Sequence, residues 1–174
     1  MKNIVLVGFM GTGKNVVGKK LAAALGMKYI STDSIIEARE KRSINDIFAG
    51  SGEPYFRKAE KDAVREASLA EGAVIAAGGG AVIDAENIEI LKKNGLLVCL
   101  TASPEEILKR TGRNKDRPLL NVPDPLSKIK ELLEKRKTHY ARAGYTVDTT
   151  GKSVDEVVDE VIRIIKPFGT GVSA

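Results

Sequence analysis

The stretch Ile4-Val5-Leu6-Val7-Gly8-Phe9-Met10-Gly11-Thr12-Gly13-Lys14 decides how this chain of 174 residues folds. Its first four residues form a β-branched apolar run that Gly8 ends, which predicts a strand buried on both faces. Residues 8 to 14 match the spacing Gly-x-x-x-x-Gly-Lys of a phosphate-binding loop. After the loop, apolar residues recur at helical spacing until Gly26, a typical stop residue. A strand, a glycine loop and a helix in this order are the context that the motif requires.

The chemistry of this loop favours the phosphates of ATP. Glycines let backbone N–H groups turn towards phosphate oxygens, and the following helix N-terminus adds the positive end of its dipole. Lys14 supplies a full charge near the β and γ phosphates. A glycine turn without a ligand would leave a lysine at this offset unexplained. We therefore expect ATP contacts along the loop, from Gly11, Thr12, Gly13, Lys14, Asn15 and Val16.

The position after Lys14 departs from the motif. The pattern calls for Ser or Thr, whose hydroxyl binds Mg²⁺, and this chain has Asn15. An amide oxygen is a neutral, hard acceptor that can bind Mg²⁺ directly or through water. We expect that Mg²⁺ is still required, and that ATP oxygens, water and Asn15 hold it.

The rest of the chain alternates apolar runs with helical patterns, which predicts an α/β fold with a parallel sheet. Crowded prolines and charges in residues 112–124 indicate a polar excursion that we interpret as a lid loop. We expect one domain over residues 1–167 and a disordered tail over 168–174. Strands are predicted at 4–7, 27–30, 73–77, 96–100 and 145–148. Helices are predicted after the loop to 25, at 53–70, up to a stop at Gly95, at 126–142 and at 154–165. Two more helix starts are predicted from caps, one at Ser34, where Ser34-Ile35-Ile36-Glu37 has the spacing of a capping box, and one at Ser103, with Ser as the cap and Pro104 in the first turn.

Composition narrows the partners. The chain carries 28 basic and 23 acidic residues, a net charge of +5, but the two signs are interspersed, which favours small anionic ligands over nucleic acid. No apolar stretch could span a bilayer, and the N-terminal apolar run is too short for a signal peptide, so we expect a soluble, cytoplasmic protein without membrane partners. The single cysteine, Cys99, lies in the apolar run 96–100 and is interpreted as a buried strand thiol.

Five further segments, taken in chain order, resemble shikimate kinase. They are Asp33 after the second strand, Gly50-Ser51-Gly52-Glu53-Pro54-Tyr55-Phe56-Arg57, the triple glycine 78–80, Arg117-Pro118-Leu119-Leu120, and Arg136 before His139-Tyr140. The resemblance extends to residue 167. It implies a three-layer P-loop kinase fold with strand order 2-3-1-4-5, a monomer, and transfer of the ATP γ-phosphate to the 3-hydroxyl of shikimate.

The same resemblance implies residue roles. Asp33 would hold the acceptor hydroxyls and take the proton, and Arg57 and Arg136 would clamp the substrate carboxylate, which suits the bidentate guanidinium fork. The other implied roles are backbone approach of Gly79 and Gly80 to the substrate ring, closure of the lid arginine Arg117 over the phosphoryl group, and stacking of Arg110 near the adenine. Lys14, Asp33 and Arg117 are therefore the expected catalytic residues.

Two alternatives stay open on the sequence. Ser31 stands where the family commonly has a second acidic residue near the metal, so both metal-side positions are altered. Together with Asn15 it leaves open a non-catalytic relative that keeps the fold and binds nucleotide or a partner protein. The phosphate loop and lid by themselves also fit a kinase for another small polyol or a nucleoside monophosphate.

Overall fold

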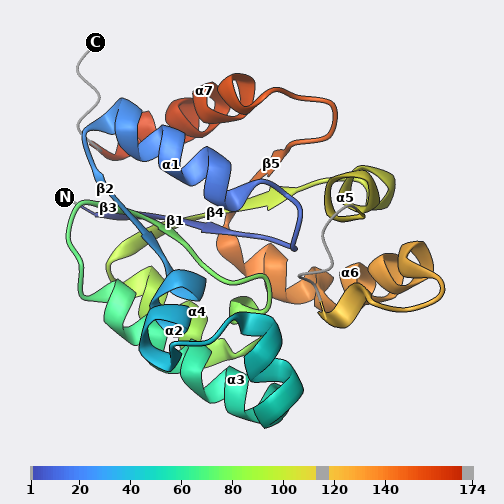
Figure 1. The fold of residues 1–174 in the computed structure, drawn as a ribbon. Coiled ribbons are helices and arrows are strands. Elements are labelled where there is room, and N and C mark those ends of the chain that lie inside the picture. The colour runs from blue at the N-terminus through green and yellow to red at the C-terminus, as the bar shows by residue number, and fades with distance from the viewer. Residues whose placement is uncertain (1, 113–117, 170–174) are drawn as a thin grey trace.

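Five parallel strands form the centre of the fold, in the order β2-β3-β1-β4-β5 (Figure 1). The coordinates are a computed structural model, which describes residues 2–112 and 118–169. The expected α/β class, the parallel sheet and the strand order are confirmed. The strands are β1 (Asn3–Val7), β2 (Lys28–Ser31), β3 (Ala73–Ala76), β4 (Gly95–Thr101) and β5 (Tyr145–Asp148).

Helices cover both faces of the sheet. The seven α-helices are α1 (Lys14–Leu25), α2 (Thr32–Glu40), α3 (Ile44–Ser68), α4 (Ala85–Lys93), α5 (Pro104–Thr111), α6 (Pro125–Tyr140) and α7 (Val154–Ile165) within the described residues. Short 3₁₀ helices are η1 (Ala81–Ile83), η2 (Pro118–Leu120), η3 (Ala141–Ala143) and η4 (Lys166–Phe168). Helices α1 and α7 lie on one face, and α3, α4 and α6 lie on the other (Figure 1).

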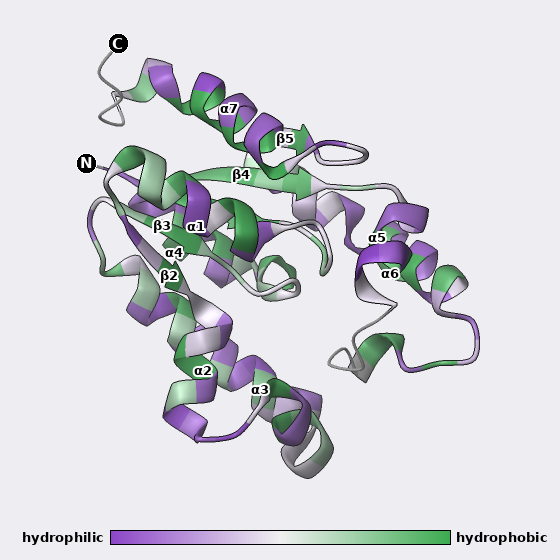
Figure 2. Cartoon of the chain, turned by 45° about the horizontal axis from the view of Figure 1, so that its top comes forward, coloured by the Kyte–Doolittle hydropathy of each residue, from purple (hydrophilic) through white to green (hydrophobic). Residues whose placement is uncertain are grey.

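The sheet sits between two apolar layers, because alternate residues of each strand point to opposite faces. Ile4 and Leu6 of β1 pack against α1 and α7, whereas Val5 and Val7 pack towards α3, α4 and α6. Strand β4 is hydrophobic along its length, and α7 carries hydrophobic and hydrophilic residues on different sides (Figure 2). Cys99 is buried in β4, as expected, and burial raises the pKa of its thiol to about 11.

Parallel pairing brings the carboxyl ends of the strands to one edge of the sheet. Val7 of β1 pairs with Cys99 of β4, and Ser31 of β2 pairs with Ala76 of β3. The loops that follow these strands therefore meet at one edge, which is where open α/β sheets bind ligands.

Three sequence expectations about helix ends were wrong. Helix α2 begins at Thr32 with Ser31 as its N-cap, so the capping-box spacing that begins at Ser34 lies inside the helix. Helix α3 begins at Ile44 and kinks at Gly52, whose backbone has φ 80° and ψ 170°, whereas the sequence indicated a helix only from Glu53. Gly95 opens strand β4 instead of ending α4, because its backbone pairs with Asn3 of β1.

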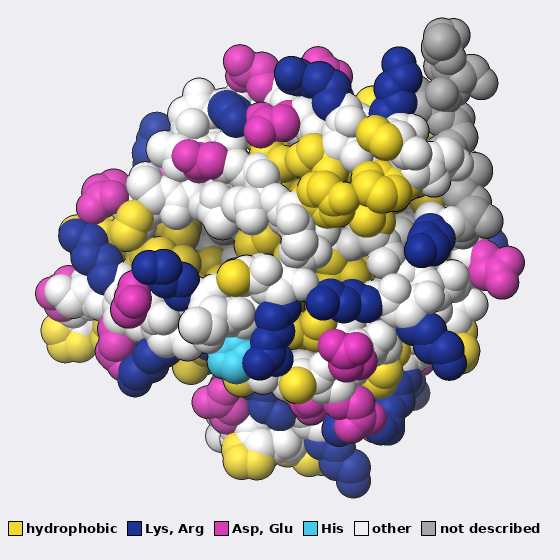
Figure 3. Space-filling view, turned by 180° about the vertical axis from the view of Figure 1, so that it is seen from behind, with side chains coloured by type: hydrophobic (Ala, Val, Ile, Leu, Met, Phe, Trp, Pro, Cys, Tyr) yellow, Lys and Arg dark blue, Asp and Glu magenta, His cyan; other side chains and the backbone are white. Residues whose placement is uncertain are grey.

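The structure describes part of the C-terminal segment that the sequence predicted as a tail. Of the expected tail 168–174, Phe168 and Gly169 are described and complete the η4 turn, where the Phe168 ring meets Tyr145 edge-on. Residues 170–174 lie outside the described residues. Within the described part of the chain, none of the helices combines the length and the apolarity that crossing a membrane would need. Acidic and basic side chains are interspersed on the face shown in Figure 3.

Candidate active site

The phosphate loop connects β1 to α1 and is shaped by glycine. Gly8 has φ 138°, and a Cβ there would lie 2.2 Å from the Leu100 carbonyl oxygen of β4, so no other residue fits. Thr12 is buried, and its hydroxyl donates to the Phe9 carbonyl at 2.8 Å. The loop is therefore held from within by its own side chains and is seated tightly on the neighbouring strand.

Lys14 opens helix α1 and turns back over the loop. Its ammonium group donates to the carbonyls of Gly8 at 2.8 Å and Phe9 at 2.9 Å, and the residue is only 9% exposed. The two carbonyls are neutral acceptors, and anionic oxygens would be stronger partners for this ammonium group. This placement agrees with the predicted role of Lys14 towards phosphate.

A cavity of about 390 Å³ opens in front of the loop. The residues that the sequence predicts for ATP are in its lining, namely Gly11, Gly13, Lys14, Asn15, Val16 and Arg110. Asn15 and Val16 are exposed in the first turn of α1. The structure therefore brings most of the expected nucleotide residues to one cavity.

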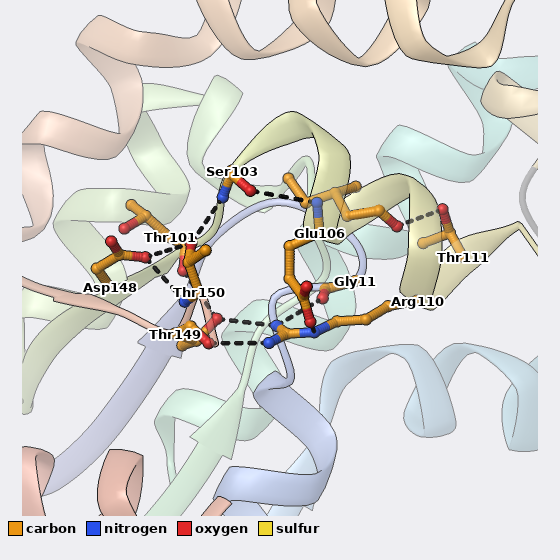
Figure 4. Close-up of polar contacts among 10 residues, drawn as sticks. Gly11, Thr101, Ser103, Glu106, Arg110, Thr111, Asp148, Thr149 and Thr150 are labelled. Atoms are coloured by element: carbon orange, nitrogen blue, oxygen red, sulfur yellow. Dashed lines mark hydrogen bonds and ion pairs between the residues drawn. The ribbon is translucent and has the colours of Figure 1, made fainter. Parts of the chain in front are cut away.

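Arg110 of α5 joins three segments that are distant in the sequence (Figure 4). Its Nε donates to Glu106 at 2.9 Å, its Nη1 donates to the Gly11 carbonyl at 3.3 Å and to the Thr149 hydroxyl at 2.9 Å, and its Nη2 donates to the Thr149 carbonyl at 2.8 Å. The Thr149 hydroxyl in turn donates to the Thr101 carbonyl at 2.9 Å. Arg110 thus ties the phosphate loop to the loop after β5, a structural role that the sequence did not reveal, while its stacking near the adenine stays a prediction.

Asp33 lies in the first turn of α2, directly after β2. The Ser31 hydroxyl accepts the Ser34 N–H at 3.3 Å and so caps this helix. Asp33 is half-buried and lines both the nucleotide cavity and a second, smaller cavity of about 60 Å³. Met10 and Gly79 line both cavities as well. Asp33 therefore stands where the two cavities meet.

The second cavity, which we call the acceptor cavity, collects the other predicted substrate residues. Arg57, Gly79, Gly80 and Arg136 line it together with Asp33. Met10, Ile44, Phe48, Phe56 and Leu119 add apolar side chains to the lining of the same cavity. Two guanidinium groups, with the carboxylates of Asp33 and Glu60 and several apolar side chains, suit a small polar ring that carries its own carboxylate.

Glu60 is a site residue that sequence reasoning missed. It is 2% exposed, and one of its oxygens accepts from Arg57 Nη1 at 2.7 Å. Its other oxygen, Oε1, has no hydrogen-bond partner among the described residues. Burial raises the pKa of Glu60, and the charges of Arg57 and Arg136 oppose that rise. The i, i+3 spacing of Arg57 and Glu60 on one helix was the available signal.

Arg57 is held by two glutamates of α3. Glu60 is buried, and Glu53, which accepts from Nη2 at 2.9 Å, has a side chain that is 50% exposed. Burial lowers the pKa of Arg57, but the charges and hydrogen bonds of the two glutamates outweigh it and raise the pKa. The guanidinium is therefore charged and oriented along the cavity wall.

The triple glycine after β3 leaves the space that these side chains occupy. A Cβ on Gly78 would lie 2.7 Å from Glu60 Oε1 and 2.8 Å from Asp33 Oδ1, and one on Gly80 would lie 2.2 Å from Arg57 Nη1. Gly78 is also fixed through its N–H, which donates to the Thr32 hydroxyl at 2.9 Å. Any side chain at these positions would displace the charged groups of the acceptor cavity.

Arg136 reaches the acceptor cavity from α6. It is 6% exposed, and its guanidinium lies over the Phe9 ring, 5.6 Å from the ring centroid. Arg57 and Arg136 are far apart in the sequence, and the fold places both on one cavity, as expected. Of the lid 112–124, residues 113–117 lie outside the described residues, and so does the predicted catalytic residue Arg117.

The residues near the phosphate loop fit a magnesium ion that ATP and water hold for the most part. Mg²⁺ in kinase sites typically binds one or two carboxylates together with substrate phosphates and several waters. Here the nucleotide cavity offers one carboxylate, Asp33, and the amide of Asn15. Over residues 2–112 and 118–169, no three His, Cys, Asp or Glu side chains gather into a cluster that could hold a metal. The donor set does not fit a site made by the protein alone.

A phosphate loop on the central strand, an adjoining acceptor cavity and a carboxylate between them define a P-loop kinase of small molecules. The sequence profile of shikimate kinase matches residues 10–166. The chain is 52% identical to the shikimate kinase of Caldanaerobacter subterraneus over 94% of this chain and 95% of that protein, and 49% identical to the shikimate kinase of Thermoanaerobacter pseudethanolicus over the same shares. The chain belongs to the shikimate kinase family, and it is a phosphotransferase that uses ATP.

A solved structure agrees with the fold. The crystallised shikimate kinase from Acinetobacter baumannii, described as a complex with shikimate, superposes with a TM-score of 0.93 at 37% identity, covering 97% of this chain and 95% of the other. The superposition covers nearly the whole of this chain, so the sheet and the helices on both of its faces are shared.

Proposed function

We propose that this protein transfers the γ-phosphoryl group of ATP to the 3-hydroxyl of shikimate and releases ADP and shikimate 3-phosphate. The observation that carries the proposal is the shared lining of the two cavities, because Asp33 belongs both to the cavity at the phosphate loop and to the cavity with the two arginines. A hydroxyl held at Asp33 would therefore face the end of a triphosphate seated on the loop. Phosphoryl transfer depends chiefly on such positioning and on charge stabilisation.

On the donor side, the loop N–H groups of residues 11–16 would bind the phosphate oxygens. The Lys14 ammonium would exchange its two carbonyl partners for phosphate oxygens and stabilise charge on the transferring group. The Arg110 side chain would flank the nucleotide base while its guanidinium group keeps its hydrogen bond to the loop. The lid residue Arg117 would add a positive charge when ATP binds. Mg²⁺, held by ATP, water, Asn15 and Asp33, would supply neutralisation of the phosphate charge.

On the acceptor side, Arg57 and Arg136 would bind the carboxylate of shikimate through paired N–H donors. The backbone at Gly79 and Gly80 would approach the ring, since no side chain stands between. Asp33 would accept the hydrogen bond of the attacking hydroxyl, orient it and take its proton as the O–P bond forms. The interspersed acidic and basic side chains support the further expectation that the protein has no nucleic-acid partner.

A coupled assay of ADP release tests the reaction. We expect release that depends on shikimate and on Mg²⁺, and low release with other polyols or nucleoside monophosphates in a panel of acceptors. Asp33→Asn should lose at least about 100-fold in kcat with ATP binding retained, which corresponds to the usual contribution of a general base. Shikimate-independent turnover, turnover without Mg²⁺, or a fully active Asp33→Asn enzyme would each refute the corresponding part.

A further inference from the structure

Tyr140, the last residue of α6, does not line the acceptor cavity. It contacts the backbone of Gly79, a residue that does. Its hydroxyl donates to the Gly79 carbonyl at 2.6 Å, and its side chain is almost fully buried. The Arg136 Nη1 group points at the same carbonyl from 3.4 Å. One backbone oxygen of the triple glycine thus receives donors from two residues one turn apart on α6.

Fixing this carbonyl fixes the next N–H. The peptide group is planar and trans, so the Gly79 C=O and the Gly80 N–H point in opposite directions. Both glycines line the acceptor cavity, and glycine backbones have wide conformational freedom that no side chain limits. The hydrogen bond at 2.6 Å therefore sets the direction of the N–H of Gly80, a residue that lines the acceptor cavity.

Arg136 cannot replace the tyrosine in this role while it holds a substrate. Its contact with the Gly79 carbonyl is long, and its donors would turn to the carboxylate of the acceptor. The hydroxyl of Tyr140 has no such second task. Burial raises the pKa of Tyr140 to about 12, against the opposing charge of Arg136, so the hydroxyl keeps its proton and stays a donor at neutral pH.

We propose that Tyr140 is a positioning residue for the acceptor site, whose hydroxyl holds the peptide between Gly79 and Gly80 in the orientation that receives shikimate. The proposal rests on the function proposed above. It assigns to α6 two separate contributions, namely a guanidinium that binds the substrate and a phenol that orders the backbone facing it.

The test is Tyr140→Phe, which removes one oxygen and keeps the ring. We expect the KM for shikimate to rise about five- to tenfold, as for loss of one neutral hydrogen bond at a binding site. The KM for ATP and kcat should stay within about twofold of the wild-type enzyme, since the N–H that the hydroxyl orients belongs to Gly80, which lines the acceptor cavity and is not in the lining of the nucleotide cavity. The matched control is Tyr145→Phe in β5, where the ring packs on Phe168, and it should leave both KM values unchanged.

Calorimetric titration and the melting temperature separate a loss of shikimate positioning from a loss of stability. Calorimetric titration of shikimate into each folded variant reports binding without turnover and should show the same five- to tenfold loss for Tyr140→Phe. An unchanged shikimate affinity, or KM values for ATP and shikimate that rise together with a lower melting temperature, would overturn the positioning role. Failure of the wild-type enzyme to release ADP with shikimate would instead overturn the proposed function.

Discussion

Replacing Glu60 by Gln tests how the carboxylate clamp is held. The substitution keeps the size of the side chain and removes the charge that lies 2.7 Å from Arg57 Nη1. A hydrogen bond to a charged group contributes about 1.5–3 kcal/mol, or about 10- to 100-fold in affinity. The Arg57 side chain is 26% exposed, so water screens part of this interaction and the lower end applies. We expect the KM for shikimate to rise about tenfold.

The matched control is Glu53→Gln, which removes the other carboxylate partner of the same guanidinium. The Glu53 side chain is 50% exposed, and exposed ion pairs contribute at most about 1 kcal/mol. Its effect on the KM for shikimate should therefore stay below about threefold. Steady-state kinetics at saturating ATP measure both variants, and equal effects of the two substitutions, or no effect of Glu60→Gln, would refute the reasoning.

The pH dependence of Glu60 gives a second measurement on the same pair. Burial raises the pKa of Glu60 above its ordinary value of 4.5, so its charge is lost, as the pH falls, earlier than that of an exposed glutamate. The KM for shikimate should rise as the pH is lowered in the wild-type enzyme. In Glu60→Gln the KM starts high, and this additional rise should be absent.

Three other substitutions separate nucleotide binding, acceptor geometry and stability. Thr149→Val removes the hydroxyl that accepts from Arg110 at 2.9 Å. We expect the KM for ATP to rise about three- to tenfold, with the KM for shikimate unchanged. A change in the KM for shikimate alone would contradict this prediction. Gly78→Ala places a Cβ within 3 Å of Glu60 and Asp33. It should lower kcat/KM for shikimate about 100-fold in the coupled assay. A fully active variant would show that the two carboxylates can move apart freely. Ser31→Ala removes the N-cap of α2 and should cost about 1 kcal/mol, seen as a melting temperature lowered by about 2–4 °C, and an unchanged melting temperature would argue against the cap.

The sequence alone determined the features that depend on neighbours in the chain. The run Ile4–Val7, the glycine spacing and Lys14 predicted β1, the phosphate loop and α1, because strand burial, turn geometry and helix periodicity are all local properties. The cap Ser103 and Pro104 at the start of α5 were likewise confirmed. The positions of the strands were found because buried parallel strands are continuous apolar runs.

Local patterns were misleading where tertiary contacts compete with them. The serine that caps α2 is Ser31 and not Ser34, because pairing of β2 with β3 extends the strand to residue 31 and the helix follows at once. The helical segment 44–51 before Gly52 was missed, because its apolar residues Ile44 and Ile47 find their partners in α2 and the second part of α3. Such partners cannot be read from a single segment.

Only the tertiary structure decided how the site is assembled. The sequence supplied Asp33, Arg57 and Arg136 as separate residues, and the fold placed them on one cavity beside the phosphate loop. It also revealed two residues that support them, namely Glu60, which is buried on α3 beside Arg57, and Tyr140, whose hydroxyl reaches a backbone carbonyl 61 residues away. The physical reason is that a motif records the types of residues in a segment, whereas burial, charge pairing and backbone orientation depend on which segments the sheet brings to the same edge.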